Sequence, residues 1–547
     1  MGVQHDLRSS WRLALPVVSL TAIIVVLPFF HYGIPSGHDF EFHMNSWIDV
    51  VDHWKQGVIY PHWNAMAHYG YGEARFIFYP PLSWALGGLL GLLLPWKLVP
   101  AAYIWTVLTL AGCSMFALSR RYLPGSAAIW AAAFYAANPY HLVIVYWRSA
   151  FAELLAAVWV PLLVFLVLDL DDRESRAIAP LGLILAVGWF TNLPSAVMMN
   201  YSLAVFALCI AAWRKSWMVL VYAGAASLLG AALAGSYLLP AFHEQSWVNI
   251  GQVLAPGVSP QENFLFAFTD DLDHNRFNLL VSIVAAFEIL VAGGLLFVIR
   301  RSDQRKLWRL MLAWSSVMAV LMFKPTLPLW MHLPELRFVQ FPWRWLLCLN
   351  VPVAIGFALA MRRWWLRALV STAAVCVVLV GWHAVQAPWW DSADDIQEML
   401  DNQHDGIGNE GIDEYVPAGV DPYEVDQQAS LAKFVGEGTT NKAQISVLDW
   451  RAEFKSVTVR SDSSGAVVMR LFNYPLWHAT VNGREVRTES TETTGQMSVP
   501  LDAGNSQIQI AFRMGSDRKL GISLSLVGIF VLLLLFAISK RLRLSPA

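Results

Sequence analysis

The chain has 547 residues, of which 56% are hydrophobic, 13% are aromatic and only 14% are charged. Soluble domains carry about 25% charged residues, so this deficit predicts a protein whose main solvent is lipid. The net charge is −2, and no basic tract is long enough to follow a phosphate backbone, so no nucleic-acid partner is expected. All four cysteines lie inside apolar runs, which predicts packing residues rather than disulfides.

Twelve apolar runs are long enough to cross about 30 Å of hydrocarbon. In chain order they lie near residues 11–30, 99–119, 125–140, 150–169, 177–192, 195–212, 217–239, 278–299, 307–323, 343–361, 367–386 and 520–538. The first run lacks a small-residue cleavage site, so it is interpreted as a retained helix rather than a signal peptide. Basic clusters separate most pairs of runs, and the positive-inside rule then predicts that both termini are cytoplasmic.

Residues 80–95, "PPLSWALGGLLGLLLP", form one more apolar run that complicates this topology. If they crossed the membrane, every later basic cluster would move to the outer side. The run is short, bounded by prolines and rich in glycine, so an interfacial or re-entrant helix is predicted. Twelve spans are therefore predicted, and thirteen are the alternative.

The predicted topology divides the chain into four regions. They are a transmembrane domain at 1–386 with its first extracytoplasmic loop at 31–98, an acidic extracytoplasmic connector at 387–442, a segment of alternating apolar and polar residues at 443–519, and a C-terminal transmembrane helix with a basic cytoplasmic tail at 520–547. The alternation and the hairpin signal Asn482-Gly483 predict a small antiparallel β-sandwich. The predicted fold class is therefore an α-helical polytopic membrane protein with an extracytoplasmic β-sandwich, which serves either as a spacer or in glycan binding.

The first loop begins with "GHDFEFH", in which His38, Asp39, Glu41 and His43 fall within six positions. If this segment is extended, residues i and i+2 share a side, so Asp39 and Glu41 converge on one site. A carboxylate there can take a proton from a sugar hydroxyl that attacks an anomeric carbon, or hold a divalent cation against a phosphate leaving group. The spacing matches no standard zinc site, and a solvated loop is the alternative.

Arg148 and Glu153 stand in "YWRSAFAE", where the chain enters a predicted span. Glu153 is expected about one turn inside the bilayer edge, and carboxylates inside membranes are usually functional or paired. Arg148 suits either a bond to Glu153 or a bond to a lipid phosphate. A purely structural ion pair is the alternative.

The stretch "LRFVQFPWRWLL" carries Arg337, Gln340 and Arg344 where an outer loop enters a helix at Pro342. Helix N-termini favour anions, and arginine offers a bidentate fork for phosphate, so a phosphate site is predicted here. Arginines that reach from the bilayer toward the interface are the alternative. Tyr79 belongs to an aromatic-rich part of the first loop, which suits sugar stacking or an interfacial belt.

Six motifs, in order, carry a resemblance to a known family. They are "GHDFEFH" (37–43), "FYPPLSW" (78–84), "YWRSAFAE" (146–153), "QFPWRWLL" (340–347), "DEYVP" (413–417) and "YPLWHATVNGREV" (474–486). Together they resemble bacterial membrane proteins of the 6-pyruvoyl-tetrahydropterin synthase-related domain group, akin to YfhO-like proteins, over nearly the whole chain. The zinc histidines of soluble pterin synthases are not seen, so no pterin chemistry is expected. The group in turn looks like the GT-C superfamily of membrane glycosyltransferases.

The GT-C resemblance implies an enzyme of the bacterial inner membrane. It would transfer a hexosyl or pentosyl group from a polyprenyl-phosphate donor to an extracytoplasmic glycan, lipid or protein acceptor. The resemblance implies that Asp39 is the catalytic acid of the first loop with Glu41 second, although Phe40 separates them where the superfamily often has adjacent acids. Substrate or phosphate binding is expected from His38, His43, Tyr79, Arg148, Glu153, Arg337 and Arg344. No metal site is assigned, and a divalent cation, Mg or Mn, is the one cofactor left open.

Two other classes of function remain as alternatives, both acting on lipid-linked glycans of the cell envelope. A transporter or flippase would need ionisable residues deep inside several spans, and Glu288 is the clearest one here. A non-catalytic assembly factor would give no reason for acids and arginines to gather on one face of the membrane.

Overall fold

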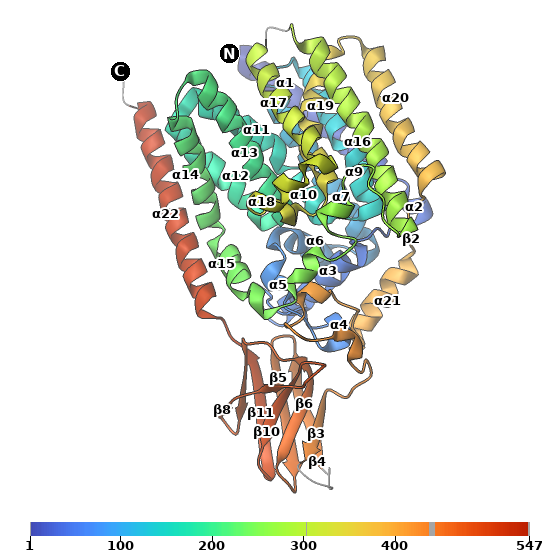
Figure 1. Cartoon of the computed structure of the whole chain (residues 1–547), viewed down its shortest axis with the longest axis vertical. Helices are drawn as coiled ribbons and strands as arrows, with labels where there is room; N and C mark the ends of the chain where they lie inside the picture. Colours follow the sequence, from blue (N-terminus) through green and yellow to red (C-terminus); the bar gives the residue numbers. More distant parts are fainter. Residues whose placement is uncertain (1, 302–303, 437–442, 545–547) are drawn as a thin grey trace.

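The computed structural model describes residues 2–301, 304–436 and 443–544 of the chain. Figure 1 shows a bundle of helices joined to a β-sandwich, with both chain ends at the end of the bundle far from the sandwich. This arrangement confirms the predicted fold class, a multi-pass helical membrane protein with a C-terminal β-sandwich. Residues 437–442 of the predicted connector and 545–547 of the predicted tail lie outside the described residues.

Nine helical segments in the described part of the chain are long and apolar enough to cross a membrane. They are Ser10–Tyr32, Trp96–Ser119, Gly125–Arg148, Phe151–Leu170, Leu193–Arg214, Leu272–Ile299, Pro342–Ala360, Trp364–Val385 and Ser516–Ser539. Two helix pairs pass the same test only together, because they bend by 78° at residues 233–235 and by 92° at 321–324; counting each as one span gives up to eleven. The remaining predicted run, at 177–192, forms a shorter apolar helix, Ser175–Thr191. Nine to eleven segments of the described residues thus correspond to the twelve predicted spans.

The helices of the bundle are α1 (Gly2–Val26), α2 (Phe29–Tyr32), α7 (Val99–Ser119), α8 (Gly125–Ala136), α9 (Pro139–Val143), α10 (Phe151–Ala156), α11 (Trp159–Arg173), α12 (Ile178–Thr191), α13 (Leu193–Arg214), α14 (Met218–Leu233), α15 (Gly235–Glu244), α16 (Leu272–Ile299), α17 (Arg305–Leu321), α18 (Leu327–His332), α19 (Leu346–Ala360), α20 (Trp364–Val380) and α22 (Ser516–Leu544). Short η8 (Leu336–Val339) and η9 (Pro342–Trp345) precede α19. Large apolar side chains on the outer faces of α16 and α22, such as Leu290 and Leu533, are exposed. An apolar band of this kind is suited to lipid rather than to water.

The apolar run at 80–95 forms α6 (Pro81–Leu93), whose 13 residues reach only about 20 Å at the rise of an α-helix. This length is too short to span the hydrocarbon core, as predicted. Instead, α6 packs along α3 (Phe40–Lys55). Gly87 allows this close approach, because a Cβ at that position would lie 2.2 Å from the Trp47 ring.

The predicted first loop is largely folded, and its opening segment is helical. α3 begins directly after Asp39, and its buried side chains Phe40, Met44, Trp47 and Val51 recur at helical spacing. The extended geometry expected for "GHDFEFH" is therefore wrong. The other elements of the loop are β1 (Ile34–Pro35), α4 (Ala67–Gly70), α5 (Arg75–Phe78) and η1 (Trp96–Leu98).

Two antiparallel sheets form the sandwich, with strand orders β3-β6-β10-β9 and β4-β5-β11-β7-β8. The strands are β3 (Ala432–Gly436), β4 (Ala443–Arg451), β5 (Phe454–Ser461), β6 (Gly465–Phe472), β7 (Trp477–Val481), β8 (Arg484–Val486), β9 (Glu489–Ser490), β10 (Gln496–Leu501) and β11 (Gly504–Phe512). Asn482 and Gly483, with φ of 51° and 78°, turn between β7 and β8, which confirms the predicted hairpin. β3 lies inside the predicted connector, so the sandwich starts before residue 443.

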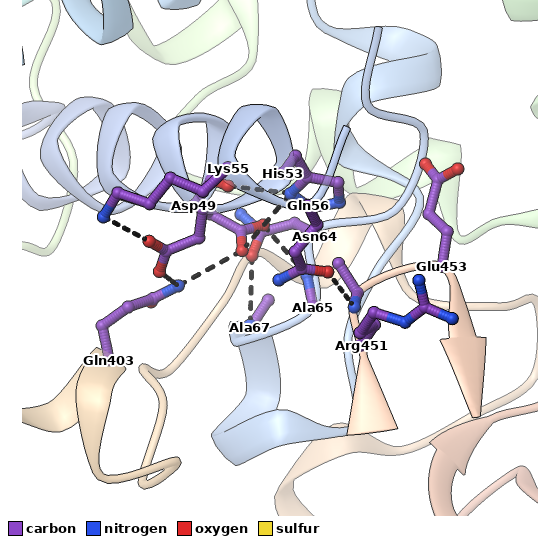
Figure 2. Close-up of polar contacts among 12 residues, drawn as sticks. Asp49, His53, Lys55, Gln56, Asn64, Ala65, Ala67, Gln403, Arg451 and Glu453 are labelled. Carbon is purple, nitrogen blue, oxygen red and sulfur yellow. Dashed lines mark hydrogen bonds and ion pairs between the residues drawn. The ribbon is translucent and has the colours of Figure 1, made fainter. Parts of the chain in front are cut away.

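A buried polar network joins α3 to the connector (Figure 2). Asp49 of α3 is 2% exposed. It accepts the Ala65 N–H at 3.0 Å and a Gln403 amide N–H at 3.2 Å. Gln403 belongs to α21 (Ala393–His404), the one long helix of the connector in the described residues. Just after α3, Gln56 Oε1 accepts the Ala452 N–H of the β4–β5 turn at 2.9 Å. The sandwich is thus fixed to the membrane domain through α3 as well as through α22.

Candidate functional site

The segment 33–39, which leads into α3, is held on one side by the start of the connector. β1 within it pairs antiparallel with β2 (Trp390–Asp391). The Ser36 N–H also donates to the Trp389 carbonyl at 3.0 Å. These bonds bring two segments that are far apart in the sequence to the same edge of the bundle.

On its other side the same segment contacts the end of the span Gly125–Arg148. The Gly37 N–H donates to Ser149 Oγ at 2.9 Å, and the Asp39 N–H donates to the Arg148 carbonyl at 2.9 Å. A Cβ at residue 37 would lie 2.5 Å from the Arg148 carbonyl carbon, so only glycine fits. A π-helical turn ends the span, and left-handed Ser149 (φ 48°) follows it. Asp39 is thereby fixed beside Arg148.

Glu153 is the centre of a buried charged cluster and is 1% exposed. Its Oε2 accepts hydrogen bonds from Arg148 and, at 3.1 Å, from Arg344 Nε. Its Oε1 accepts the hydroxyl of Tyr140. Buried charges are tolerated only when paired, so these groups depend on one another. Two guanidinium groups face this one carboxylate, and Asp39, whose Oδ2 lies 3.7 Å from Arg148 Nη2, supplies the second negative charge of the cluster.

Arg344, in η9, is held by more than its bond to Glu153. Its Nη1 donates to the Val339 carbonyl at 2.8 Å and to Gln340 Oε1 at 2.9 Å. Three of the five N–H groups of the guanidinium are thus used, and Nη2 makes no hydrogen bond to a described residue. The side chain also packs 4.5 Å from the Phe341 ring centroid. Arg344 is therefore rigid, with two N–H groups left for a ligand.

Asp39 is the least buried carboxylate of this group. Its side chain is 39% exposed, and Oδ2 lies 3.7 Å from Arg148 Nη2. It occupies the N-cap position of α3 but makes no side-chain hydrogen bond to the first N–H groups of the helix. Because an N-cap aspartate usually forms such bonds, this carboxylate is available to a group outside the helix.

A cavity of about 710 Å³ borders the charged cluster. Its polar lining includes His38, Asp39, Tyr79, Glu153, Arg344 and Glu414. Its apolar lining comes from α12, α13, α15 and η8 and includes Trp189, Leu193, Val197, Leu238, Phe242 and Phe338. Phe242 is 72% exposed, so the cavity reaches the surface of the bundle at α15. Charge at one end and an apolar wall leading outward suit an amphiphilic ligand with an anionic head.

Five of the nine predicted site residues line this cavity, and Arg148 is bonded to one of them, Glu153, without lining it. Tyr79 and His38 line the cavity, whereas His43 is buried in α3 between the rings of Trp47 and Phe151. Burial lowers the pKa of His43 to about 3, so its imidazole is neutral. Its Nε2 has no hydrogen-bond partner among the described residues.

Glu41 and Arg337 are not brought to the cavity. Glu41 lies in the first turn of α3, where residues i and i+2 face different sides, and it lines a second, smaller cavity. The predicted convergence of Asp39 and Glu41 is therefore wrong. Arg337 is exposed on η8, and its guanidinium packs 4.8 Å from the ring centroid of neighbouring Phe338. Of the two arginines predicted to bind a phosphate here, only Arg344 lines the cavity.

Two residues of the site were not predicted from the sequence. Tyr140, at the start of α9, carried no signal beyond the preceding Asn-Pro helix start. Glu414, in η11 (Asp413–Tyr415), stood among many acids of the connector, and only its place in "DEYVP" marked it. Burial raises the pKa of Glu414 to about 7, and negative Glu73 adds to the shift. A carboxyl with such a pKa exchanges its proton near neutral pH.

A metal ion needs several ligand side chains gathered around one point. Over residues 2–301, 304–436 and 443–544, no group of three or more His, Cys, Asp or Glu side chains is placed to hold a metal ion. Asp39 and Glu41, the acids for which a divalent cation was left open, line different cavities. The residues present do not form a ready ligand set for a cation.

Comparison with known families gives one match. The family described as "6-pyruvoyl-tetrahydropterin synthase related domain; membrane protein" matches residues 76–389, which is more than half of the chain. The matched region contains Arg148, Glu153 and Arg344, whereas Asp39 precedes it. No curated protein matches the chain.

Proposed function

The chain belongs to the 6-pyruvoyl-tetrahydropterin synthase-related family of membrane proteins, and from that premise we propose that it is a membrane glycosyltransferase of the GT-C type. It would take a sugar from a polyprenyl-phosphate donor and transfer it to an acceptor outside the cytoplasm. The resemblance of the "GHDFEFH" loop to the acidic first loop of that superfamily supports the proposal.

One observation carries the proposal: a carboxylate, a fixed cation and an apolar wall line a single cavity. Asp39 and Arg344 lie at its polar end, and apolar side chains of α13 and α15 lead to the surface. A polyprenyl phosphate has the same division, with an anionic head on an apolar chain. The Nη2 group of Arg344, which bonds to no described residue, offers the hydrogen-bond donors for that head.

The proposed sugar transfer needs only these side chains, the donor and the acceptor. The acceptor hydroxyl oxygen forms a bond to the anomeric carbon of the donor sugar, and Asp39 takes the hydroxyl proton. The bond between that carbon and the phosphate oxygen breaks, and its electron pair leaves with the polyprenyl phosphate. Arg344 faces the charge that develops on this phosphate, where a fixed cation stabilises the transition state most.

The same proposal includes an orientation in the bacterial cytoplasmic membrane. Both termini lie at the end of the bundle opposite the sandwich (Figure 1), which suits cytoplasmic termini and an extracytoplasmic sandwich. A green fluorescent protein fused to the C-terminus should fluoresce, because this reporter folds in the cytoplasm. A protease added to intact spheroplasts should cut within the connector and leave the fused reporter intact; cleavage of the reporter would reverse the orientation.

Complementation of a strain that lacks the gene tests the activity. The deletion should lose one sugar from an envelope glycan and accumulate the corresponding polyprenyl-phosphate sugar, both measured by mass spectrometry. Wild-type protein and Asp52→Asn, a matched change at a similarly exposed carboxylate that lines neither cavity, should restore the sugar. At equal membrane abundance, Asp39→Asn should not. Full transfer by both Asp39→Asn and Glu41→Gln would overturn the catalytic assignment.

The transporter alternative rests on Glu288, which is buried in α16. Its Oε1 accepts the Tyr140 N–H at 3.1 Å, and its Oε2 has no hydrogen-bond partner among the described residues. In the same strain, loss of the sugar with Glu288→Gln together with normal transfer by Asp39→Asn would favour transport over catalysis.

A further inference from the structure

A second cavity of about 410 Å³ adjoins the first. The two share His38, Phe42 and Ile412, whereas Asp39 lines only the first cavity and Glu41 only the second. The cavities therefore meet at the start of α3. His38, next to Asp39 in the chain, lines both cavities, so a ligand in the second cavity would lie close to the Asp39 carboxylate.

The lining of the second cavity differs in chemistry from that of the first. Its polar side chains include Glu41, Asn45, Arg75, Asn409 and Glu410, and the exposed indole of Trp389 lies among them. Carboxylates, amides and a guanidinium together donate to and accept from hydroxyl groups. An exposed indole offers a flat apolar face with a polar edge. This combination suits a sugar ring, which has hydroxyl groups on its rim and apolar C–H groups on its faces.

Asn45 gives independent evidence that the cavity is built for a ligand. It is 8% exposed, lines the cavity, and its amide makes no hydrogen bond to a described residue. Buried polar side chains are nearly always hydrogen bonded in native proteins. Asn45 lines the cavity and its amide bonds to no described residue, so this amide is suited to a partner that enters the cavity from outside.

The connector wall of the cavity is fixed in place rather than loosely laid over it. The Asn409 N–H donates to the Met66 carbonyl at 2.9 Å, and the Tyr69 N–H donates to the Asn409 carbonyl at 2.8 Å. The Ile412 N–H donates to Glu73 Oε2 at 2.7 Å. Such a wall needs little ordering when a ligand binds, which favours affinity.

Charge limits the kind of sugar that fits. Burial raises the pKa of Glu41, and the nearby carboxylates of Asp391 and Glu410 add to this shift, so the region is already rich in negative charge. The one cation of the lining, Arg75, is committed to an ion pair with buried Glu73. An acidic sugar would be repelled here, whereas an uncharged one would not.

From these features we infer that the second cavity binds the acceptor, as an uncharged, hydroxyl-rich sugar. The inference rests on the proposed function, in which the lipid-linked donor occupies the first cavity. The acceptor sugar stacks on Trp389, bonds to Asn45 and presents its attacking hydroxyl toward Asp39. The connector thus supplies one wall of the acceptor site and the membrane domain the other.

Binding can be tested without turnover, by saturation-transfer NMR on the full-length protein in nanodiscs. The probes are glucose, galactose, mannose, arabinose and anionic glucuronate, with empty nanodiscs as the background. At least one neutral sugar should give a signal that glucuronate does not. Asn45→Ala and Trp389→Leu should each weaken its binding about tenfold, the effect of one lost hydrogen bond or ring contact. Trp364→Leu, a change of another exposed tryptophan, should leave binding unchanged.

The outcomes separate this inference from the proposed function. No neutral sugar binding to the wild type, or equal binding by Asn45→Ala and Trp389→Leu, would overturn the inference even if Asp39→Asn abolishes transfer in cells. Binding that is lost in both variants supports the acceptor cavity even if Asp39→Asn keeps full transfer. Stronger binding of glucuronate than of any neutral sugar would overturn the charge argument and with it the inference.

Discussion

Asp39, at the N-cap of α3, and Asp49, inside the same helix, lie ten residues apart, yet their surroundings are opposite. Asp49 is buried and accepts hydrogen bonds from Ala65 and Gln403 (Figure 2). Asp39 is partly exposed, caps no helix N–H group and faces a cavity. A fully bonded carboxylate holds parts of the fold together, whereas a carboxylate with free lone pairs can take a proton.

Glu153 resembles Asp49 in that it is buried and fully hydrogen bonded. It is as buried as Asp49, and its bonds to Arg148 and Arg344 fix the cations of the site. The residues that carry the proposed chemistry, Asp39 and the free edge of Arg344, are thus held by neighbours that are themselves fully bonded. This division predicts which substitutions change stability and which change activity.

Glu153→Gln should have the largest effect on stability. Glutamine keeps the shape but removes the charge, so two buried guanidinium groups lose their counter-charge at a cost of about 3–5 kcal/mol. Denaturant titration of the protein in detergent micelles measures this change in the free energy of unfolding. Glu41→Gln, at an exposed site on α3, is the control. Equal stability of Glu153→Gln and wild type would show that the cluster is not a mutually dependent unit.

Asp49→Ala and Asp39→Ala test the comparison directly. Asp49→Ala leaves the Ala65 N–H and one N–H of the Gln403 amide without a partner, while the other N–H of Gln403 keeps its bond to Asp52; the loss should cost about 1–3 kcal/mol for each group. Asp39→Ala should change the free energy of unfolding by less than about 0.5 kcal/mol, as at a surface site. The same titration checks both. Greater destabilisation by Asp39→Ala than by Asp49→Ala would reverse the assignment of the two carboxylates.

Gly37→Ala should disturb the placement of Asp39. The added Cβ would meet the backbone of Trp147 and Arg148 at 2.5–2.6 Å, so the segment must shift, at about 1–3 kcal/mol of overpacking. Transfer in the complementation assay should fall more than protein abundance does. Gly224→Ala is the matched control, since a Cβ there meets nothing within 4 Å, and alanine in a helix should stabilise by about 0.5–1 kcal/mol. Unchanged transfer by Gly37→Ala would show that the close approach does not position the site.

Glu414 should make the stability of the protein depend on pH. Burial holds its pKa near 7 in the folded protein, above the ordinary 4.5. Between these values the folded state keeps a proton that the unfolded state has released, so this contribution to stability falls as pH rises. This contribution is measured by comparing the melting temperatures of wild type and Glu414→Gln from about pH 5 to about pH 8. The wild type should lose stability relative to the variant, and parallel curves would contradict the assigned pKa.

Patterns along the chain were sufficient for the large features of the fold. All twelve apolar runs are helical, α6 is too short to span, and Asn482-Gly483 turns a hairpin in a two-sheet sandwich. These features depend on local length, charge and alternation, which a sequence displays directly. The helical spacing of Phe40, Met44, Trp47 and Val51 was present as well, but the prediction for this segment rested only on the extended geometry in which Asp39 and Glu41 would converge.

The sequence by itself determined that the protein lies mainly in lipid, how many apolar runs it has, that a sandwich follows them and to which family it belongs. Only the tertiary structure decided which polar groups share a site. It joined Asp39 to Arg148, Glu153 and Arg344, separated Glu41 and Arg337 from them, and added Glu414. The physical reason is that such contacts depend on bends, turns and close approaches between distant segments. The contact of Gly37 with Arg148 and the pairing of β1 with β2 are examples, and neither leaves a periodic pattern in the chain.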